Sequence, residues 1–107
     1  MSVTFDDGRS FDLGCEYLRV HSPSAEVMGH APGQEVLQTG KESVNIDNIE
    51  PVGHYAIKIH FTDGHNTGLY TWNYLYKLGE NRERNWQAYL DALQAAGIKR
   101  QERQDAG

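Results

Sequence analysis

The sequence predicts a small single-domain α+β protein, in which strands joined by tight turns come first and a pair of helices comes last. Residues 54–61 alternate apolar and polar side chains, which is typical of a half-buried strand. Residues 86–93 instead carry apolar side chains at helical spacing. A chain of 107 residues has the length of one domain. We therefore expect one folded unit over residues 1–97, followed by a polar, disordered tail over residues 98–107.

The first strands are expected to form a hairpin. Residues 3–5 and 10–13 flank Asp7-Gly8, and Asp-Gly is a favoured hairpin turn. Residues 16–21 then continue as an extended segment, with Tyr17 on one side and Leu18 on the other.

A helical turn is expected over residues 22–27. Ser22 is placed as its N-cap and Pro23 at its first helical position, where the missing N–H costs nothing. Residues 29–42 contain three glycines and a proline, and they are expected to be an irregular surface loop. Strand character returns over residues 44–52.

The strand over residues 54–61 runs into a second Asp-Gly pair, Asp63-Gly64. As a two-residue turn, this pair sets Thr62 opposite His65. His60 and His65 then lie diagonally on one face of the sheet, close enough for one ligand to bridge them. The segments FDDG and FTDG are similar to each other, and the sequence shows no other internal repeat.

The last third of the chain is expected to be helical. Thr71 is placed as the N-cap of a helix over residues 72–78, which Gly79 ends. Asn81 caps a second helix that runs to about Ala96. The apolar stripe of this second helix consists of Trp86, Tyr89, Leu90 and Leu93. Stripes of this kind usually cover a sheet, so we assign it to core packing rather than to a cofactor site.

The charge of the chain argues against binding to nucleic acid. Fifteen acidic residues exceed ten basic ones and give a net charge of -5, whereas phosphate-backbone binding needs clustered lysine and arginine. Cys15 is the sole cysteine, so an intrachain disulfide is excluded. We expect Cys15 to be a small, buried apolar residue. The first ten residues show no basic region followed by an apolar run, and no long apolar stretch occurs later, so secretion and membrane spanning are not expected. We expect a cytoplasmic protein that does not bind membranes.

No sequence motif indicates catalysis. The glycines lack the spacing of a phosphate loop, and Gly-x-Ser-x-Gly is missing. No histidine is followed two residues later by an acid, so half of a facial iron triad is absent. Asp63 lies near His65, but on a turn that is expected to be open and to shift pKa values little. The sequence therefore predicts a protein that is not an enzyme and uses no cofactor.

Four segments of the chain carry a family resemblance. They read YLRVHSPSAEV (17–27), GHAPGQEVLQTGKESV (29–44), EPVGHYAIKIHFTDGH (50–65) and GLYTWNYLYKLG (68–79). Together they resemble the small stand-alone bacterial members of the gamma-butyrobetaine hydroxylase-like N-terminal domain family, over roughly residues 3–95. The resemblance implies a compact α+β domain with a mixed or antiparallel sheet. It also implies relatives that precede carnitine-synthesis oxygenases or are appended to P-loop carrier ATPases of iron–sulfur cluster assembly.

In the oxygenases, the resemblance implies a structural zinc held by three cysteines and one histidine. The cysteines follow a Trp-Leu-Arg segment as Cys-x-Cys-x-x-Cys, and the histidine follows a strand turn similar to FTDGH. Tyr17-Leu18-Arg19 matches the Trp-Leu-Arg segment here. The four ligand positions fall on Ser22, Ser24, Val27 and His65. Serine is a poor zinc ligand and valine is none, so a degenerate site without metal is expected, with His65 hydrogen-bonded to Ser22 or Ser24.

The leading hypothesis for the function is a non-catalytic accessory or interaction domain. The family resemblance implies docking to an oxygenase or to an iron–sulfur assembly carrier. The partner is thus expected to be a protein, and the domain itself a monomer or a weak homodimer. The expected contact residues are Gly33, Gln34, Glu35, Tyr70 and Trp72. Aromatic residues among them favour an interface.

The alternative hypothesis is a histidine-based protein that binds a divalent metal ion. Imidazole coordinates such ions readily. The candidate ligands are His21, His30, His60 and His65. The positions of these rings discriminate between the two hypotheses, because two or three converging nitrogens favour metal binding and scattered rings favour docking.

Overall fold

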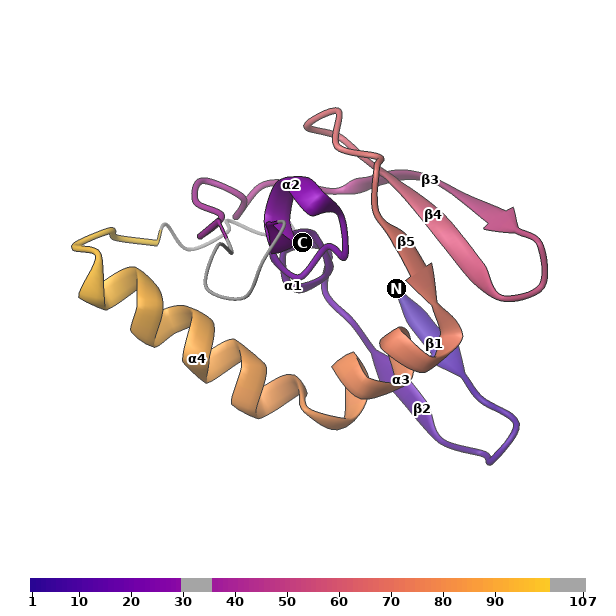
Figure 1. Cartoon of the computed structure of the whole chain (residues 1–107). Helices are drawn as coiled ribbons and strands as arrows, with labels where there is room; N and C mark the ends of the chain where they lie inside the picture. Colours follow the sequence, from indigo (N-terminus) through magenta and orange to yellow (C-terminus); the bar gives the residue numbers. More distant parts are fainter. Residues whose placement is uncertain (30–35, 101–107) are drawn as a thin grey trace.

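The computed structural model describes residues 1–29 and 36–100, and in these ranges it contains two antiparallel sheets and four helices. One sheet pairs β1 (Ser2–Thr4) with β2 (Ser10–Asp12). The other has the strand order β3 (Ile46–Val52), β4 (Ala56–Phe61) and β5 (Leu69–Thr71). The helices are α1 (Cys15–Val20), α2 (Ala25–Met28), α3 (Trp72–Glu80) and α4 (Arg82–Ala95). Figure 1 shows the two sheets on one side of the molecule and α4 on the other.

The predicted α+β class is confirmed, with antiparallel sheets and the C-terminal helices α3 and α4 packed on the sheet. The largest core cluster joins α1, strands β4 and β5, and α3, together with one residue after β2 and one before β3. It consists of Leu13, Tyr17, Leu18, Val44, Ile57, Ile59, Phe61, Tyr70, Leu75 and Leu78. The stripe of α4 buries Tyr89 and Leu93 against Val20, and Trp86 contacts both clusters. Within the described residues, no helix is long and apolar enough to cross a membrane.

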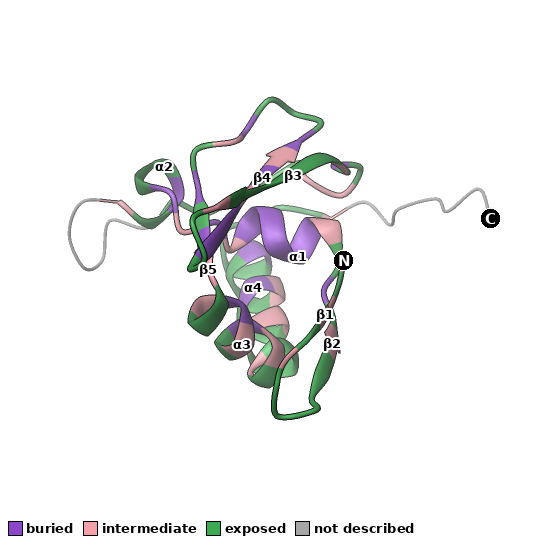
Figure 2. Ribbon diagram, turned by 90° about the vertical axis from the view of Figure 1, so that its right-hand side faces the viewer, coloured by how far each residue is buried: buried purple, intermediate pink, exposed green. Residues whose placement is uncertain are grey.

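Helix α1 corrects the extended segment expected over residues 16–21. Every residue from Glu16 to Val20 is buried, and Figure 2 shows α1 enclosed between the three-stranded sheet and the helices α3 and α4. Hydrophobic periodicity arises from the contrast between a buried and an exposed face. A six-residue helix that is buried on all sides offers no such contrast, so its sequence does not distinguish helix from strand.

Two tyrosines hold the C-terminal end of α1. A helix leaves its last carbonyl groups without helical partners, and in a buried helix water does not supply them. The hydroxyl of Tyr70 donates to the Leu18 carbonyl at 2.6 Å, and the hydroxyl of Tyr74 donates to the His21 carbonyl at 2.6 Å. Strand β5 and helix α3 thereby satisfy the carbonyl groups that burial would otherwise leave unpaired.

The two similar Asp-Gly segments adopt the same turn. In FDDGR (5–9) and FTDGH (61–65), the first residue donates its N–H to the fifth carbonyl, at 2.9 and 3.0 Å. The fourth N–H donates to the first carbonyl, again at 2.9 and 3.0 Å. The aspartate at the third position accepts the fifth N–H in both turns. The glycines have φ values of 86° and 87°, the left-handed conformation that closes a three-residue hairpin loop.

The expected two-residue turn at Asp63-Gly64 is therefore wrong by one residue. Phe61, and not Thr62, lies opposite His65, and a one-residue shift moves a side chain to the other face of the sheet. His65 lies on the core side, with its ring 6.1 Å from that of Phe61. His60 lies on the other face and contacts Glu50 at 2.6 Å. One ligand does not bridge the two imidazoles in this arrangement.

The helix caps are partly as predicted. Thr71 accepts the N–H of Tyr74 at 3.1 Å and caps α3, as expected. The cap of α2 is Ser24 rather than Ser22, since the Ser24 hydroxyl accepts the N–H of Glu26 at 3.2 Å. Ser22 lies two residues earlier, and its side chain contacts His65 in the second Asp-Gly turn.

Gly79 does not end the first C-terminal helix, because α3 continues through it to Glu80. A Cβ atom at this position would overlap the ring of Phe11, which packs against the bare glycine Cα. The glycine therefore serves a close approach between α3 and the first hairpin. Asn81 forms the break between the helices, although its side chain makes no capping hydrogen bond to α4. Helix α4 ends at Ala95, close to the expected position.

Replacing Gly79 with alanine is expected to lower the free energy of unfolding by about 1–3 kcal/mol, because the added methyl group overpacks against Phe11. The direction is opposite to the gain of about 1 kcal/mol that alanine brings to an unconstrained helix. Equilibrium urea unfolding measures the difference.

A Phe11→Ala background supplies the control for this prediction. Without the ring, Gly79→Ala is expected to be neutral or stabilising, and the two substitutions should show strong coupling in a double-mutant cycle. Asn73→Ala, at an exposed position of the same helix, is expected to change stability by less than about 0.5 kcal/mol. An equal loss from Gly79→Ala in both backgrounds would contradict the role given to Phe11.

Candidate functional site

A buried polar cluster joins the segment after α1 to the turn between β4 and β5. At its centre, His65 is 7% exposed. The Nε2 atom of His65 lies 2.8 Å from Ser22 Oγ, and the Nδ1 atom lies 3.3 Å from a carboxylate oxygen of Glu26. The hydrogen bond expected between His65 and one of the two serines is thus confirmed, with Ser22 as the partner.

The partners of His65 define the positions of its protons. A carboxylate only accepts hydrogen bonds, so the proton of the neutral ring lies on Nδ1 and faces Glu26, while Nε2 accepts the hydroxyl proton of Ser22. The Ser22 oxygen in turn accepts the N–H of Ser24 at 3.3 Å. The Ser24 hydroxyl bonds that of Thr67 at 2.7 Å. Throughout the described residues, no buried side-chain nitrogen or oxygen lacks a hydrogen-bond partner.

An ion pair anchors the turn that carries His65. Arg19 is buried in α1, and its Nε donates to Asp63 at 2.8 Å. Lys41 donates to the same oxygen at 3.0 Å, and the backbone N–H of His65 donates to the other oxygen at 3.1 Å. Burial by itself raises the pKa of Asp63, but the hydrogen bonds from Lys41, His65 and Arg19 outweigh it and lower the pKa to about 2. Asp63 is therefore charged over the whole physiological range.

The same surroundings act on His65 in the opposite sense. Burial and the positive charge of Arg19 lower the pKa of His65, and the carboxylates of Glu26 and Asp63 raise it by less. The ring is neutral at physiological pH as a result. The expectation that the turn is open and shifts pKa values little is wrong, because the three-residue loop turns His65 into the core.

Ser22, His65 and Glu26 have the hydrogen-bond order of a hydrolase triad. Ser22 is fully buried, however, and its oxygen already accepts a backbone N–H. Gly68 packs so closely on it that a Cβ at that position would overlap Ser22 Oγ. A nucleophile needs access to a substrate and donors for an oxyanion. In this structure a substrate has no access to Ser22. The three residues instead connect two distant segments of the chain, and we call Ser22, His65 and Glu26 the polar lock.

The residues at the zinc positions that the resemblance implies do not fit a tetrahedral zinc site. The hydroxyls of Ser22 and Ser24 are engaged with His65 and Thr67, and the buried side chain of Val27 offers no donor atom. His65 alone carries a good ligand atom. Along residues 1–29 and 36–100, no group of three histidine, cysteine or acidic side chains is placed to hold a metal ion.

The histidines named as alternative ligands do not converge where they are described. Nδ1 of His21 lies 2.9 Å from the Tyr17 carbonyl, and burial lowers the pKa of His21. His60 contacts a carboxylate on the outer face of the sheet, and His65 belongs to the polar lock. His30 lies outside the described residues. The described rings thus engage separate partners.

The predicted contact residues have different outcomes. Trp72 is 41% exposed, in keeping with a contact role. Tyr70 is 0% exposed, so its assignment to a contact surface is wrong, because its hydroxyl is needed inside to hold α1. The remaining predicted residues, Gly33, Gln34 and Glu35, lie outside the described residues.

Trp72 belongs to an exposed aromatic corner, which we define as residues 53–55 together with Trp72. Its indole Nε1 donates to the His54 carbonyl at 3.0 Å, and its backbone N–H donates to the Tyr55 carbonyl at 3.2 Å. Tyr55 is 57% exposed, and its ring lies against Gly53. Two large aromatic side chains are therefore exposed on segments that hydrogen bonds join.

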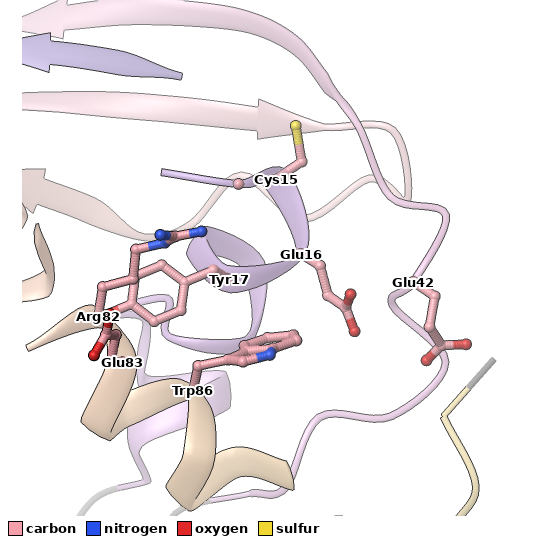
Figure 3. Close-up of a pocket in the computed structure, with 8 residues that line it drawn as sticks. Cys15, Glu16, Tyr17, Glu42, Arg82, Glu83 and Trp86 are labelled. Carbon is pink, nitrogen blue, oxygen red and sulfur yellow. The ribbon is translucent and has the colours of Figure 1, made fainter. Parts of the chain in front are cut away.

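A cavity of about 400 Å³ lies between the beginnings of α1 and α4 (Figure 3). Its walls are residues 14–17, Glu42, Arg82, Glu83 and Trp86. Cys15, for which a buried role was expected, is half-buried at the first position of α1 and lines this cavity. The sequence carried no signal for the cavity, because its walls come from three separated segments.

Two other site residues were also missed from the sequence. Glu26 gave no signal as a partner of His65, and Asp63 was seen only as part of a turn. The repeated aspartate in FDDG and FTDG is the signal that would have placed Asp63, since both aspartates accept the same backbone N–H.

The fold described above is that of a small α+β domain with antiparallel sheets. Among families of known sequence, the gamma-butyrobetaine hydroxylase-like N-terminal family matches residues 1–76, and the chain belongs to this family. No match is found among curated proteins.

Three solved structures are similar to this chain. One NMR solution structure is 51% identical, with a TM-score of 0.80, and the match covers 99% of this chain and 79% of that one. A second NMR structure is 46% identical, with a TM-score of 0.79 and coverages of 98% and 82%. The third is a crystal structure from Acidithiobacillus ferrooxidans of a protein of unknown function in the DUF971 family. It is 44% identical, with a TM-score of 0.60 and coverages of 74% and 78%.

The stability of the protein is expected to fall in two steps as the pH decreases. Unfolded histidine binds a proton near pH 6.5, while folded His65 and His21 have lowered pKa values, so their contribution is complete above pH 6.5 and is lost below it. The lowered pKa of Asp63 adds a second loss, from about pH 4 toward its folded value of about 2. Urea unfolding between pH 8 and pH 3 follows both steps.

Single substitutions separate the two steps. His65→Gln is expected to reduce the first step, leaving the part due to His21, and Asp63→Asn is expected to remove the second. A first step of unchanged size in His65→Gln would show that His65 is not held neutral by its surroundings.

Placing cysteines at the ligand positions that the resemblance implies is expected to create a zinc site. The triple variant Ser22→Cys, Ser24→Cys and Val27→Cys should bind one zinc ion per chain, because three thiolates then join His65. The unmodified chain should bind none at the same micromolar concentration. Native mass spectrometry and a chelator competition measure both.

The control adds His65→Ala to the triple variant and is expected to weaken the zinc affinity. Stoichiometric zinc in the unmodified chain would contradict the degenerate-site interpretation.

Proposed function

We propose that this chain is a non-catalytic accessory domain that docks a protein partner through the aromatic corner. The observation that carries the proposal is the exposure of Trp72 and Tyr55 on hydrogen-bonded segments, while the buried polar side chains of residues 1–29 and 36–100 all have hydrogen-bond partners. Tryptophan and tyrosine are the residues most enriched at the energetic centres of protein interfaces.

The frame of the corner favours binding energetically. A side chain that is ordered before binding loses less conformational entropy when the complex forms. The hydrogen bond from the Trp72 indole to the His54 carbonyl restricts the ring in the free domain. The corner is therefore prepared to contribute an aromatic anchor at a low entropic cost.

The family supplies two candidate partners. Its name refers to the N-terminal domain of a hydroxylase, so the catalytic part of an oxygenase is the first candidate. An iron–sulfur assembly carrier is the second, as the family resemblance implies. With one cysteine, this chain does not ligate a cluster by itself, and its contribution to such a carrier is contact between proteins.

Titrating the ¹⁵N-labelled protein with each candidate partner tests the proposal. Binding is expected to shift the Trp72 indole N–H and the amides of residues 53–55. Trp72→Ala is expected to weaken the affinity at least about tenfold, the size of effect typical of an interface anchor. Isothermal titration calorimetry provides the affinities.

Ile98→Ala is the matched control, because Ile98 is a large apolar side chain with a similar exposure at a different place in the fold. It is expected to leave the affinity unchanged. The proposal fails if neither partner binds, or if Trp72→Ala and Ile98→Ala bind equally well.

A further inference from the structure

The chain holds one of its own arginines in a two-sided site at the edge of the cavity. Arg100 donates from Nε to one carboxylate oxygen of Glu16 at 2.8 Å, and a terminal nitrogen of its guanidinium contacts the other oxygen. The guanidinium lies over the Trp86 ring, 5.2 Å from its centroid. A carboxylate fork combined with an aromatic face matches a planar guanidinium, which binds both.

Glu16 requires a cation. It is 7% exposed, and a buried carboxylate that loses its partner is strongly destabilised. Arg100 is 84 residues away along the chain and lies beyond the end of α4. In the described part of this segment, the last backbone hydrogen bond runs from Ile98 to the Leu93 carbonyl. Arg100 is thus held chiefly by its side chain, and another cation of the same shape is able to replace it.

The cavity extends this site. Glu16 and Trp86 line it. Its walls contain three carboxylates (Glu16, Glu42 and Glu83) but only one guanidinium, that of Arg82. Figure 3 shows the carboxylates of Glu16 and Glu42 on one side of the Trp86 indole and Arg82 on the other. The excess of negative charge favours a cationic ligand. A volume of about 400 Å³ is within the range of small-ligand pockets.

An organic cation fits this cavity better than a metal ion. No set of three metal-binding side chains converges there among the described residues. The aromatic face of Trp86 and the paired oxygens of Glu16 select a flat group with several donors. Arginine presents such a group, whereas the ammonium group of lysine is a strongly hydrated point charge.

We propose that the cavity binds an arginine side chain of a partner protein, and that Arg100 competes for the same carboxylate and aromatic ring. This inference deepens the proposed docking function by naming the chemistry of a second contact, and it rests on that function only in assigning the arginine to a protein. The apparent affinity for a partner's arginine is proportional to the fraction of molecules in which Arg100 has left the site. Arg100 therefore acts as an internal competitor.

The probe is the peptide acetyl-Gly-Arg-Gly-amide, titrated into the full ¹⁵N-labelled chain. In Arg100→Gln, the indole N–H of Trp86 is expected to shift and saturate, with a dissociation constant at least about tenfold lower than in the unmodified chain. The indole of Trp72, in the aromatic corner, is the internal reference and is expected not to move. The chain has two tryptophans, so replacing each in turn assigns the two indole N–H signals.

Two further peptides test the ligand chemistry. Citrulline keeps the shape of arginine without its charge, and lysine keeps the charge without the planar fork. Both are expected to bind at least about tenfold more weakly than the arginine peptide. Glu42→Gln in the Arg100→Gln background is expected to weaken arginine binding several-fold, because one wall carboxylate is neutralised.

Folding controls accompany the variants. The double variant Glu16→Gln and Arg100→Gln replaces the ion pair with two neutral amides, and it is expected to fold but to show no gain in affinity. If Arg100→Gln alone does not fold, the same titration is carried out on Arg100→Lys. It keeps the charge but loses the fork, and it is expected to bind the arginine peptide more tightly than the unmodified chain.

The inference is overturned if the folded Arg100 variants bind the arginine peptide no more tightly than the unmodified chain, or if citrulline binds equally well. It is also overturned if Trp72 shifts in place of Trp86. Its failure is distinct from that of the docking proposal, which is read from the Trp72 signal in titrations with the candidate partners.

Discussion

The ion pair between Arg19 and Asp63 is the interaction on which the rest of this structure depends. It links the central helix to the turn between β4 and β5, which lies 44 residues later in the chain. Because Asp63 also accepts the His65 N–H, the ion pair positions the imidazole against Ser22. Loss of the Asp63 charge would leave the buried guanidinium of Arg19 without an anionic partner, which is among the most costly changes in a protein interior. Loss of the Arg19 charge would leave Asp63 paired with Lys41 alone.

The polar lock occupies the position where the family resemblance implies a metal clip. Both devices join the same two segments, but they differ in strength. A neutral hydrogen bond adds about 1 kcal/mol to stability, whereas a structural zinc contributes on the order of ten times as much. The lock therefore relies on the neighbouring ion pair and on the close packing of Gly68 against Ser22. It is also sensitive to pH, since the neutral form of His65 is the one that fits.

The aromatic corner and the arginine cavity are formed by different elements. The corner lies where β3, β4 and α3 meet, and it depends on hydrogen bonds between neighbouring segments. The cavity lies between α1, α4 and the segment that carries Glu42, and Arg100, which follows α4, contacts Glu16 at its edge. A partner that contacts both would bind through an aromatic anchor at one place and a charge-assisted contact at the other. Such separated contacts add affinity only when the partner's geometry reaches both.

Local signals in the sequence by themselves determined the hairpin at residues 5–9, the Thr71 cap and the helical stripe on α4. These features depend on a few neighbouring residues, whose preferences act within one turn or one strand. Tertiary structure alone decided the helical state of α1, the burial of Tyr70 and the pairing of Glu16 with Arg100. A segment buried on all sides shows no periodicity, and contacts across 52 or 84 residues depend on how the elements pack.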